Sequence, residues 1–366
     1  MARLTRAQQQ ERTRAAVLAS ARAEFTQRGY VEAKVDRIAE RAELTRGAVY
    51  SNFPTKRALY LAVLLDLVEH RATAETPPGP PVPSAATASA AEALGAFARA
   101  WLEQLPLSGD VAALQQVRLR ELAGVFDDEP AHTALTQVTR LEALLLALAL
   151  ESGGRAGARQ VRRAELVLRL LNGPGPLADP ALELGDPFDV AHACAHLDAL
   201  ALADTWDPPH LPYVDPAHPC RDAWTAPEEL PDLITGRPVG FAEDGVIAVL
   251  GTSRLGAAEE IVRAARPGDR VTVAVVTGDP VETGRLVRLR IGDFTHCLRR
   301  AFPPDAWPRL RLVLDDRAQL ATALGIPAPD DTTEYAVRVS AGTLVARAQG
   351  RGAAHAAAIT TTATTP

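Results

Sequence analysis

Hydrophobic residues recur at helical spacing through the first 205 residues of the chain. The pattern predicts an opening helix over about 8–28 that ends at Gly29, short helices over about 35–42 and 46–53, and a longer helix after Pro54–Thr55. A stretch rich in Pro, Ala and Ser, 76–89, predicts a linker. Further helices are expected at about 90–105, 110–126, 130–152, 156–172 and 187–205.

The pattern changes after Asp207. Many prolines and no clear period predict an irregular connection over 207–239. β-Branched apolar runs then predict buried parallel strands separated by helices. The expected order is strand 246–250, helix 257–265, strand 271–276, helix 281–300, strand 310–314 and a β-hairpin over 335–346.

The length of 366 residues and a hydrophobic content of 47% predict a folded, multidomain protein. We expect an all-α part followed by a small α/β domain. The expected segments are a helix-turn-helix over 1–57, a helical domain over 58–206, the Pro-rich connection over 207–239, the α/β domain over 240–355 and a disordered tail over 356–366.

The sequence predicts a cytoplasmic protein without a membrane partner or a cofactor. No apolar run reaches about 18 residues, and no apolar segment follows the arginines of the first ten residues, as a secretory signal would require. Cys194, Cys220 and Cys297 are too far apart for a Cys-x-x-Cys motif.

Charge is unevenly distributed along the chain. The net charge is −6, but residues 1–57 contain 12 Lys or Arg and 6 Asp or Glu, a balance of +6. The remainder is therefore strongly acidic. A basic amino-terminal segment on an acidic body is typical of a protein that binds nucleic acid through one end.

Residues 35–53 contain the parts of a helix-turn-helix. Ile38 and Ala39 are expected to face inward, and Val49 and Phe53 to cover the inner face of the second helix. Thr45 is a natural N-cap for that helix. The outward positions are Arg46, Gly47, Tyr50, Ser51 and Asn52.

The run LTRGAVYSNFPTKRAL over 44–59, after Gly29–Tyr30 and 35–42, resembles the DNA-binding signature of the TetR/AcrR (tetracycline-repressor-like) family. The resemblance covers about 50 of the 366 residues. It implies a homodimeric repressor that binds a palindromic operator in double-stranded DNA and responds to a small-molecule effector. It also implies the contacts: Tyr50 and Lys56 to phosphates, Arg46, Ser51 and Asn52 to bases, with Thr45 positioning the helix and Gly47 on the same face.

Two residues depart from the family pattern. Glu43 stands where the family usually has Gly in the turn, and a left-handed conformation there costs a non-glycine residue roughly 1–2 kcal/mol. Lys34 replaces a Ser or Thr. A lysine cannot cap a helix, but it could reach a phosphate.

The resemblance also implies roles for the helical body. An effector pocket is expected among its helices, lined by residues that include Phe97, Trp101, Leu122 and Phe126. The apolar stripes of 156–172 and 187–205 are expected at a dimer interface, with packing inside one chain as the alternative.

The order of elements after residue 240 resembles a thioredoxin-like fold. The Cys-x-x-Cys that such enzymes place before the first helix is missing, because 251–256 reads GTSRLG. We therefore expect no enzyme activity and a binding module, with a thiol oxidoreductase or a protein scaffold as the alternatives. The same loop has P-loop spacing, but Ala257 and Ala258 replace the essential Lys and Ser/Thr, which leaves at most an anion site.

Histidine clusters offer weaker alternatives. His192 and His196, with Cys194 between them, have the spacing of a zinc helix, although a packed helix is the preferred interpretation. His210 and His218, with Cys220, are a further candidate metal set.

Overall fold

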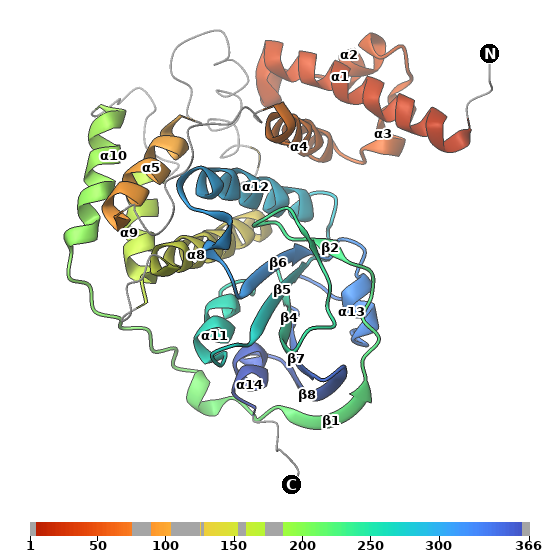
Figure 1. Ribbon diagram of the computed structural model, residues 1–366. Helices are drawn as coiled ribbons and strands as arrows, with labels where there is room; N and C mark the ends of the chain where they lie inside the picture. Colours follow the sequence, from red (N-terminus) through yellow and green to blue (C-terminus); the bar gives the residue numbers. More distant parts are fainter. Residues whose placement is uncertain are drawn as a thin grey trace. The chain divides into compact units, whose positions relative to one another are not determined.

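The computed structural model describes residues 5–74, 89–103, 125, 128–152, 159–172 and 186–360. The chain forms two compact units (Figure 1). Unit 1 comprises Met1–Pro77 and Glu103–Glu129, and unit 2 comprises Pro78–Leu102 and Pro130–Pro366. The segment expected to form the helical body is therefore divided between the two units.

Unit 1 contains the predicted amino-terminal helices, α1 (Arg6–Glu32), α2 (Val35–Arg41), α3 (Arg46–Asn52) and α4 (Lys56–Ala74). Gly29 has a φ of 70° and breaks the geometry of α1 at the predicted residue, although helical bonding continues to Glu32. Glycine reaches this conformation without steric cost.

The core of unit 1 is the apolar stripe expected from the sequence. Phe25 of α1 and Tyr60 of α4 are almost completely buried and meet edge to face, with ring centroids 5.0 Å apart. Ile38 of α2 and Val49 of α3 are also buried, at 0% and 1% exposure. Both helices of the predicted helix-turn-helix thus bury apolar side chains in unit 1.

Unit 2 is built on a six-stranded mixed sheet with the order β1-β8-β7-β4-β5-β6. The strands β4, β5 and β6 are parallel, whereas β7 pairs antiparallel with β4, β8 with β7 and β1 with β8. Their bounds are β1 (His218–Ala223), β4 (Gly245–Gly251), β5 (Arg270–Val276), β6 (Leu310–Leu314), β7 (Glu334–Ser340) and β8 (Thr343–Gln349). The mixed sheet confirms the prediction of an α/β region at this end of the chain.

Helices cover both faces of this sheet (Figure 1). One continuous core joins the inner face of the sheet to helices from both the middle and the end of the chain. These are α5 (Ala90–Leu102), α8 (Glu129–Ser152), α9 (Val161–Asn172), α10 (Pro187–His196), α11 (Ala257–Ala264), α12 (Thr283–Ala301) and α14 (Ala353–Ile359). On the other face, α13 (Gln319–Ala323) covers a second cluster.

Two segments differ from the sequence-based expectation. The Pro-rich connection supplies β1 and a small pair, β2 (Leu230–Pro231) and β3 (Pro238–Val239). An edge strand such as β1 is mostly exposed, so it needs no apolar alternation and tolerates Pro219. The expected disordered tail begins within α14, where Ala356, Ala357 and Ala358 are buried. Small residues pack closely without a visible hydrophobic period. Residues 361–366 lie outside the described residues.

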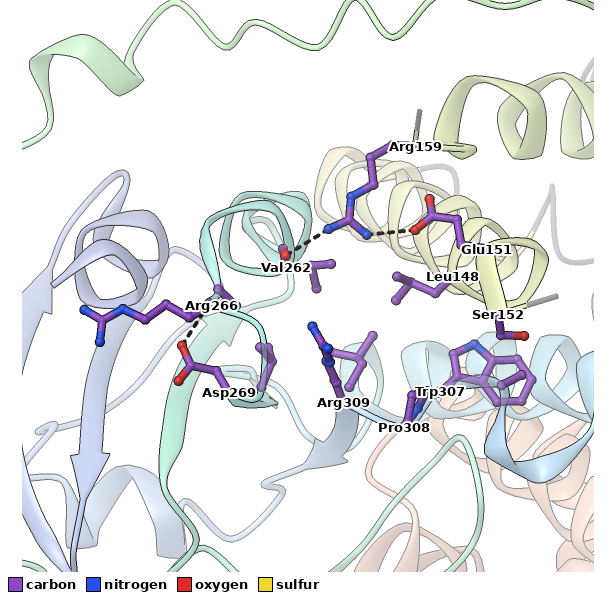
Figure 2. Close-up of a pocket in the computed structure, with 14 residues that line it drawn as sticks. Leu148, Glu151, Ser152, Arg159, Val262, Arg266, Asp269, Trp307, Pro308 and Arg309 are labelled. Atoms are coloured by element: carbon purple, nitrogen blue, oxygen red, sulfur yellow. Dashed lines mark hydrogen bonds and ion pairs between the residues drawn. The ribbon is translucent and has the colours of Figure 1, made fainter. Parts of the chain in front are cut away.

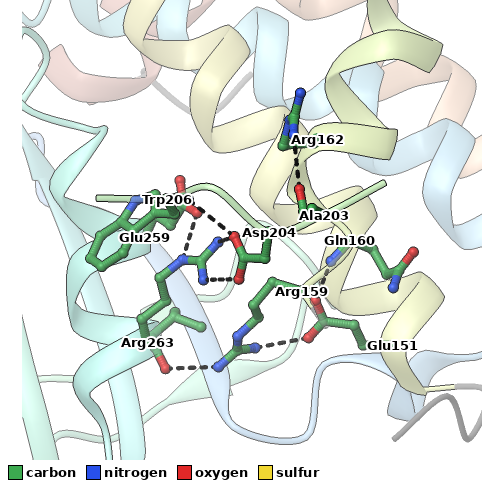
Figure 3. Close-up of polar contacts among 10 residues, drawn as sticks. Glu151, Arg159, Gln160, Arg162, Ala203, Asp204, Trp206, Glu259 and Arg263 are labelled. Carbon is green, nitrogen blue, oxygen red and sulfur yellow. Dashed lines mark hydrogen bonds and ion pairs between the residues drawn. The ribbon is translucent and has the colours of Figure 1, made fainter. Parts of the chain in front are cut away.

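Arginine side chains fix the segment after α10 to its neighbours (Figure 3). Arg263 of α11 donates to Asp204 at 2.7 and 3.1 Å and lies 4.6 Å from the ring centroid of Trp206. Arg162 of α9 donates to the carbonyl of Ala203 at 2.8 Å. This segment, expected to be helical to about 205, is instead extended after the short η1 (Leu197–Ala199).

The α9 stripe expected at a dimer interface is buried inside one chain. Val167, Leu168 and Leu171 belong to the core of unit 2. The packing alternative therefore holds for α9, because its apolar face is already covered. On α10, Phe188 is 75% exposed, whereas Cys194 is fully buried.

Among the described residues, α8 is the helix long and apolar enough to cross a membrane. Most of that stretch is buried in the core of unit 2. It also contains Glu142, which is buried beside Arg290 at 3.2 Å. These are the features of a core helix.

Candidate nucleic-acid interface

The helix-turn-helix of unit 1 is formed by α2, a turn and α3. The amide of Leu44 donates to the carbonyl of Ala39 at 2.9 Å and closes the turn. The Thr45 side chain accepts from the amide of Ala48 at 3.2 Å, which confirms the predicted N-cap. Val49 and Phe53 are 1% and 0% exposed, so the inner face of α3 is anchored as expected.

Glu43 adopts the left-handed conformation that its place in the turn predicted. Its φ is 56°, a value that favours glycine. Its side chain is exposed, so nothing in the packing of the core requires glutamate there. The turn therefore stores strain that the sequence already indicated.

Replacing Glu43 with glycine should stabilise unit 1. Relief of the left-handed strain should outweigh the extra flexibility of glycine in the unfolded chain and raise the free energy of unfolding by about 0.5–1 kcal/mol. Urea denaturation, monitored by the circular dichroism signal of the helices, measures the change. Glu43→Ala, which keeps the strain, is the control, and equal stability of the two variants would rule out this explanation.

The outer face of α3 is open to solvent. Thr45, Arg46, Gly47 and Ser51 are exposed, and Tyr50 and Asn52 are half-buried. A Cβ added at Gly47 would meet nothing closer than the Thr45 hydroxyl oxygen at 3.8 Å. Packing within the protein therefore does not require glycine there, whereas a closely approaching partner would.

Arg46 is held at the junction of α2 and α3. One guanidinium nitrogen lies 3.3 Å from a carboxylate oxygen of Asp36, and the guanidinium carbon lies 5.4 Å from the ring centroid of Tyr50. Both charged side chains are more than half exposed. Such a pair adds little stability, but it holds the guanidinium over the open face of α3.

A buried carboxylate ties α1 to α2, and the sequence analysis missed it. The Glu24 side chain is 1% exposed and lies 3.4, 3.5 and 3.8 Å from nitrogen atoms of Arg28, Arg37 and Arg41. The available signal was a glutamate on the apolar face of α1 beside Phe25. Part of the positive charge of this segment therefore orders the domain itself.

A comparison with protein families identifies this segment. Residues 17–63 match the model of the tetR family of bacterial regulatory proteins. The amino-terminal segment is therefore similar to a TetR-family domain, and it is called the TetR domain below. The resemblance drawn from the sequence is thus confirmed for the part of the chain that carries the helix-turn-helix.

Comparisons with whole proteins show weaker similarity than the comparison with protein families. A solved structure of a candidate TetR-family transcriptional regulator from Mesorhizobium loti is similar over 54% of this chain and 96% of its own. The sequence identity is 17% and the TM-score is 0.25. A search of curated proteins finds no match.

The two lysines of the TetR domain occupy different settings. The Lys56 ammonium donates to the carbonyl of Val31 at 3.2 Å and lies 4.6 Å from the ring centroid of Tyr30, so it joins the start of α4 to the end of α1. Lys34 is exposed, and its side chain does not cap α2. Lys56 therefore has a structural role in addition to the phosphate contact expected of it.

The expected effector-pocket residues lie in core packing where the structure describes them. Phe97 and Trp101 of α5 pack edge to face on Phe294 of α12, with ring centroids 5.5 and 6.0 Å apart. Phe97 is fully buried. Leu122 and Phe126 lie outside the described residues.

The glycine loop after β4 uses its amides within the protein. Gly256 donates to the Gln137 side chain at 2.8 Å, and Ser253 donates to the carbonyl of Asp331 at 2.9 Å. These donors are therefore not open to an anion. The loop contains Thr252 and Ser253 where a redox site would need thiols.

The candidate metal sets do not assemble. The imidazole nitrogens Nε2 of His192 and His196 lie 2.9 Å apart on the exposed face of α10. Cys194 is buried on the opposite face, and burial raises the pKa of its thiol to about 11. The Nε2 atom of His210 lies 3.2 Å from a carboxylate oxygen of Glu260. The described residues contain no cluster of three or more metal-ligating side chains.

Proposed function

We propose that the protein is a ligand-responsive transcriptional regulator of the TetR type, acting as a homodimeric repressor on a palindromic operator. The observation that supports this most directly is the open, polar face of α3 within a matched TetR domain. A capped, well-anchored helix with an outward arginine is what insertion into the major groove requires.

The roles of individual residues follow from their positions. Arg46, Ser51 and Asn52 would read base edges from α3. Tyr50, Lys56 and Lys34 would contact phosphates and set the register on the duplex. Thr45 positions α3 through its cap, and Gly47 allows close approach of the DNA.

Selection of bound duplexes from a random pool tests this function. We expect a palindromic consensus and an affinity that falls steeply with salt, because several phosphate contacts release counterions. Sedimentation on the selected duplex should show two chains per site. Recovery of random sequences at low salt would exclude a sequence-specific regulator.

For the carboxyl-terminal region we infer a redox-inactive, thioredoxin-like binding module. The sheet contains the neighbouring strands β8, β7, β4 and β5 in this order, and α11 follows β4 and precedes β5 along the chain. This arrangement supports the likeness to a thioredoxin fold. The absence of cysteine from 251–256 argues against an oxidoreductase. Insulin reduction by the full-length protein would overturn this inference.

A further inference from the structure

Unit 2 contains a cavity of about 300 Å³ (Figure 2). It lies where the carboxyl-terminal ends of α8 and α11 meet the starts of β5 and β6. Its lining is mainly apolar and includes Leu148, Val262, Val271, Trp307 and Leu310. Volume and composition match those of a site for a small organic molecule.

The acidic groups of this cavity are already neutralised. Glu151 accepts from Arg159 and from the amide of Gln160, each at 2.8 Å. Asp269 accepts from Arg338 at 3.1 and 2.9 Å and from the amide of Arg266 at 3.0 Å. Neither carboxylate is therefore available to a cationic ligand.

Two of the lining arginines are also engaged. Arg159 donates to Glu151 and to the carbonyl of Val262 at 3.2 Å (Figure 2). Arg266 donates to the carbonyl of Thr360. Both guanidinium groups hold the wall of the cavity together.

Arg309 differs from Arg159 and Arg266 in the surroundings of its side chain. Its side chain is exposed and extends into the space between Val262 and Trp307 (Figure 2). Its guanidinium has no hydrogen bond or ion pair to another described residue. Its backbone carbonyl accepts from the amide of Val271 at 2.8 Å, so the sheet fixes its position. Among the described residues that line this cavity, Arg309 is thus the cation without a side-chain partner.

We propose that this cavity is the effector site and binds a small amphipathic carboxylic acid. The apolar body packs on Trp307, Val262 and Leu148, and the carboxylate accepts hydrogen bonds from Arg309. A neutral ligand would leave Arg309 unused, and a cationic ligand would meet no free acid. The effector role rests on the proposed function, whereas the site and the ligand class are inferred from the cavity alone.

Binding of matched ligands to the full-length protein tests the site. The probes are 3-phenylpropionate, 3-phenylpropanol and 3-phenylpropylamine, which share a body and differ in the head group. Calorimetry should show the acid binding at least 10-fold more tightly than the alcohol, since a charge-assisted hydrogen bond to Arg309 forms with the carboxylate alone. Equal affinity for the three compounds, or no binding of the acid, would overturn the proposal.

Variants test whether the acid binds in this cavity. Arg309→Gln should weaken acid binding by about 10- to 100-fold and leave alcohol binding unchanged. Arg317→Gln removes an exposed arginine that does not line the cavity, and it should change neither. Val262→Phe should fill the cavity and weaken both ligands. Acid binding that survives Arg309→Gln would exclude this site.

Measurements of DNA binding distinguish the proposed effector site from the proposed function as a regulator. The acid should lower affinity for the selected duplex in the wild type and in Arg317→Gln, but not in Arg309→Gln at the same ligand concentration. Acid binding through Arg309 without any change in DNA affinity would overturn the effector role. Failure to select any duplex would instead overturn the proposed function and leave the calorimetric test of the cavity intact.

Discussion

Replacing Arg46 with alanine should lower affinity for the selected duplex by about 10- to 100-fold and leave binding to a scrambled duplex nearly unchanged. A bidentate arginine–guanine contact contributes about 1–3 kcal/mol of discrimination. The fold should survive, because the Arg46 side chain is 61% exposed and its ion pair with Asp36 is also exposed. Fluorescence anisotropy with both duplexes, together with a thermal melt, measures the two effects.

Lys56→Ala provides the contrast. Loss of a phosphate contact should weaken both duplexes alike and make the salt dependence shallower by about one charge. Because Lys56 also bonds to the Val31 carbonyl, a small fall in melting temperature is expected. If Arg46→Ala and Lys56→Ala reduced binding to both duplexes equally, the assignment of base reading to Arg46 would be wrong.

Replacing Asp269 with alanine should destabilise unit 2 by about 3–5 kcal/mol. The variant leaves Arg338, whose side chain is 4% exposed, without its carboxylate, and an uncompensated buried charge carries a cost of this size. Hydrogen bonds from Arg338 to the carbonyls of Ala357 and Ala358 remain and keep the loss near the lower end of this range. Urea denaturation at neutral pH measures the change.

The effect of Asp269→Ala should depend on pH in a defined direction. Burial alone would raise the pKa of Asp269, but hydrogen bonds from Arg338 and the amide of Arg266 outweigh it and lower the pKa below its ordinary value. The stabilisation by the wild-type carboxylate is therefore present above the ordinary pKa of an aspartate and is lost as the pH falls through the lowered pKa. The difference between wild type and variant should shrink in that acidic range.

Asp222→Ala is the matched control in the same sheet. Asp222 pairs with Arg347 at 2.7 Å, but the side chains are 55% and 34% exposed. An exposed pair contributes about 0–1 kcal/mol. If Asp222→Ala and Asp269→Ala cost the same, burial would not explain the importance of the Arg338 pair.

The TetR domain could be predicted from the sequence because its determinants are local. Helical periodicity, the Thr45 cap and the left-handed position of Glu43 depend on neighbours within a few residues. The strands β4, β5 and β6 were also predictable, since continuous β-branched runs indicate buried parallel strands. The side chains of α3 that face solvent followed from the same helical period.

Tertiary contacts decided the rest. The sequence contains no pattern that places β1 beside β8 or packs Phe97 on Phe294, because these partners are far apart along the chain. The partners of Glu24 and Arg338 likewise depend on which elements pack together, as does the lack of a partner for Arg309 among the residues that the structure describes.

The sequence by itself determined where the chain presents a DNA-reading helix and which residues lie on it, because periodicity and capping act over short distances. Only the tertiary structure decided that the middle helices share a core with the sheet and that a cavity remains between them, lined by Arg309, which has no side-chain partner among the described residues. Burial and charge pairing join residues from distant parts of the chain, so a local pattern does not encode them.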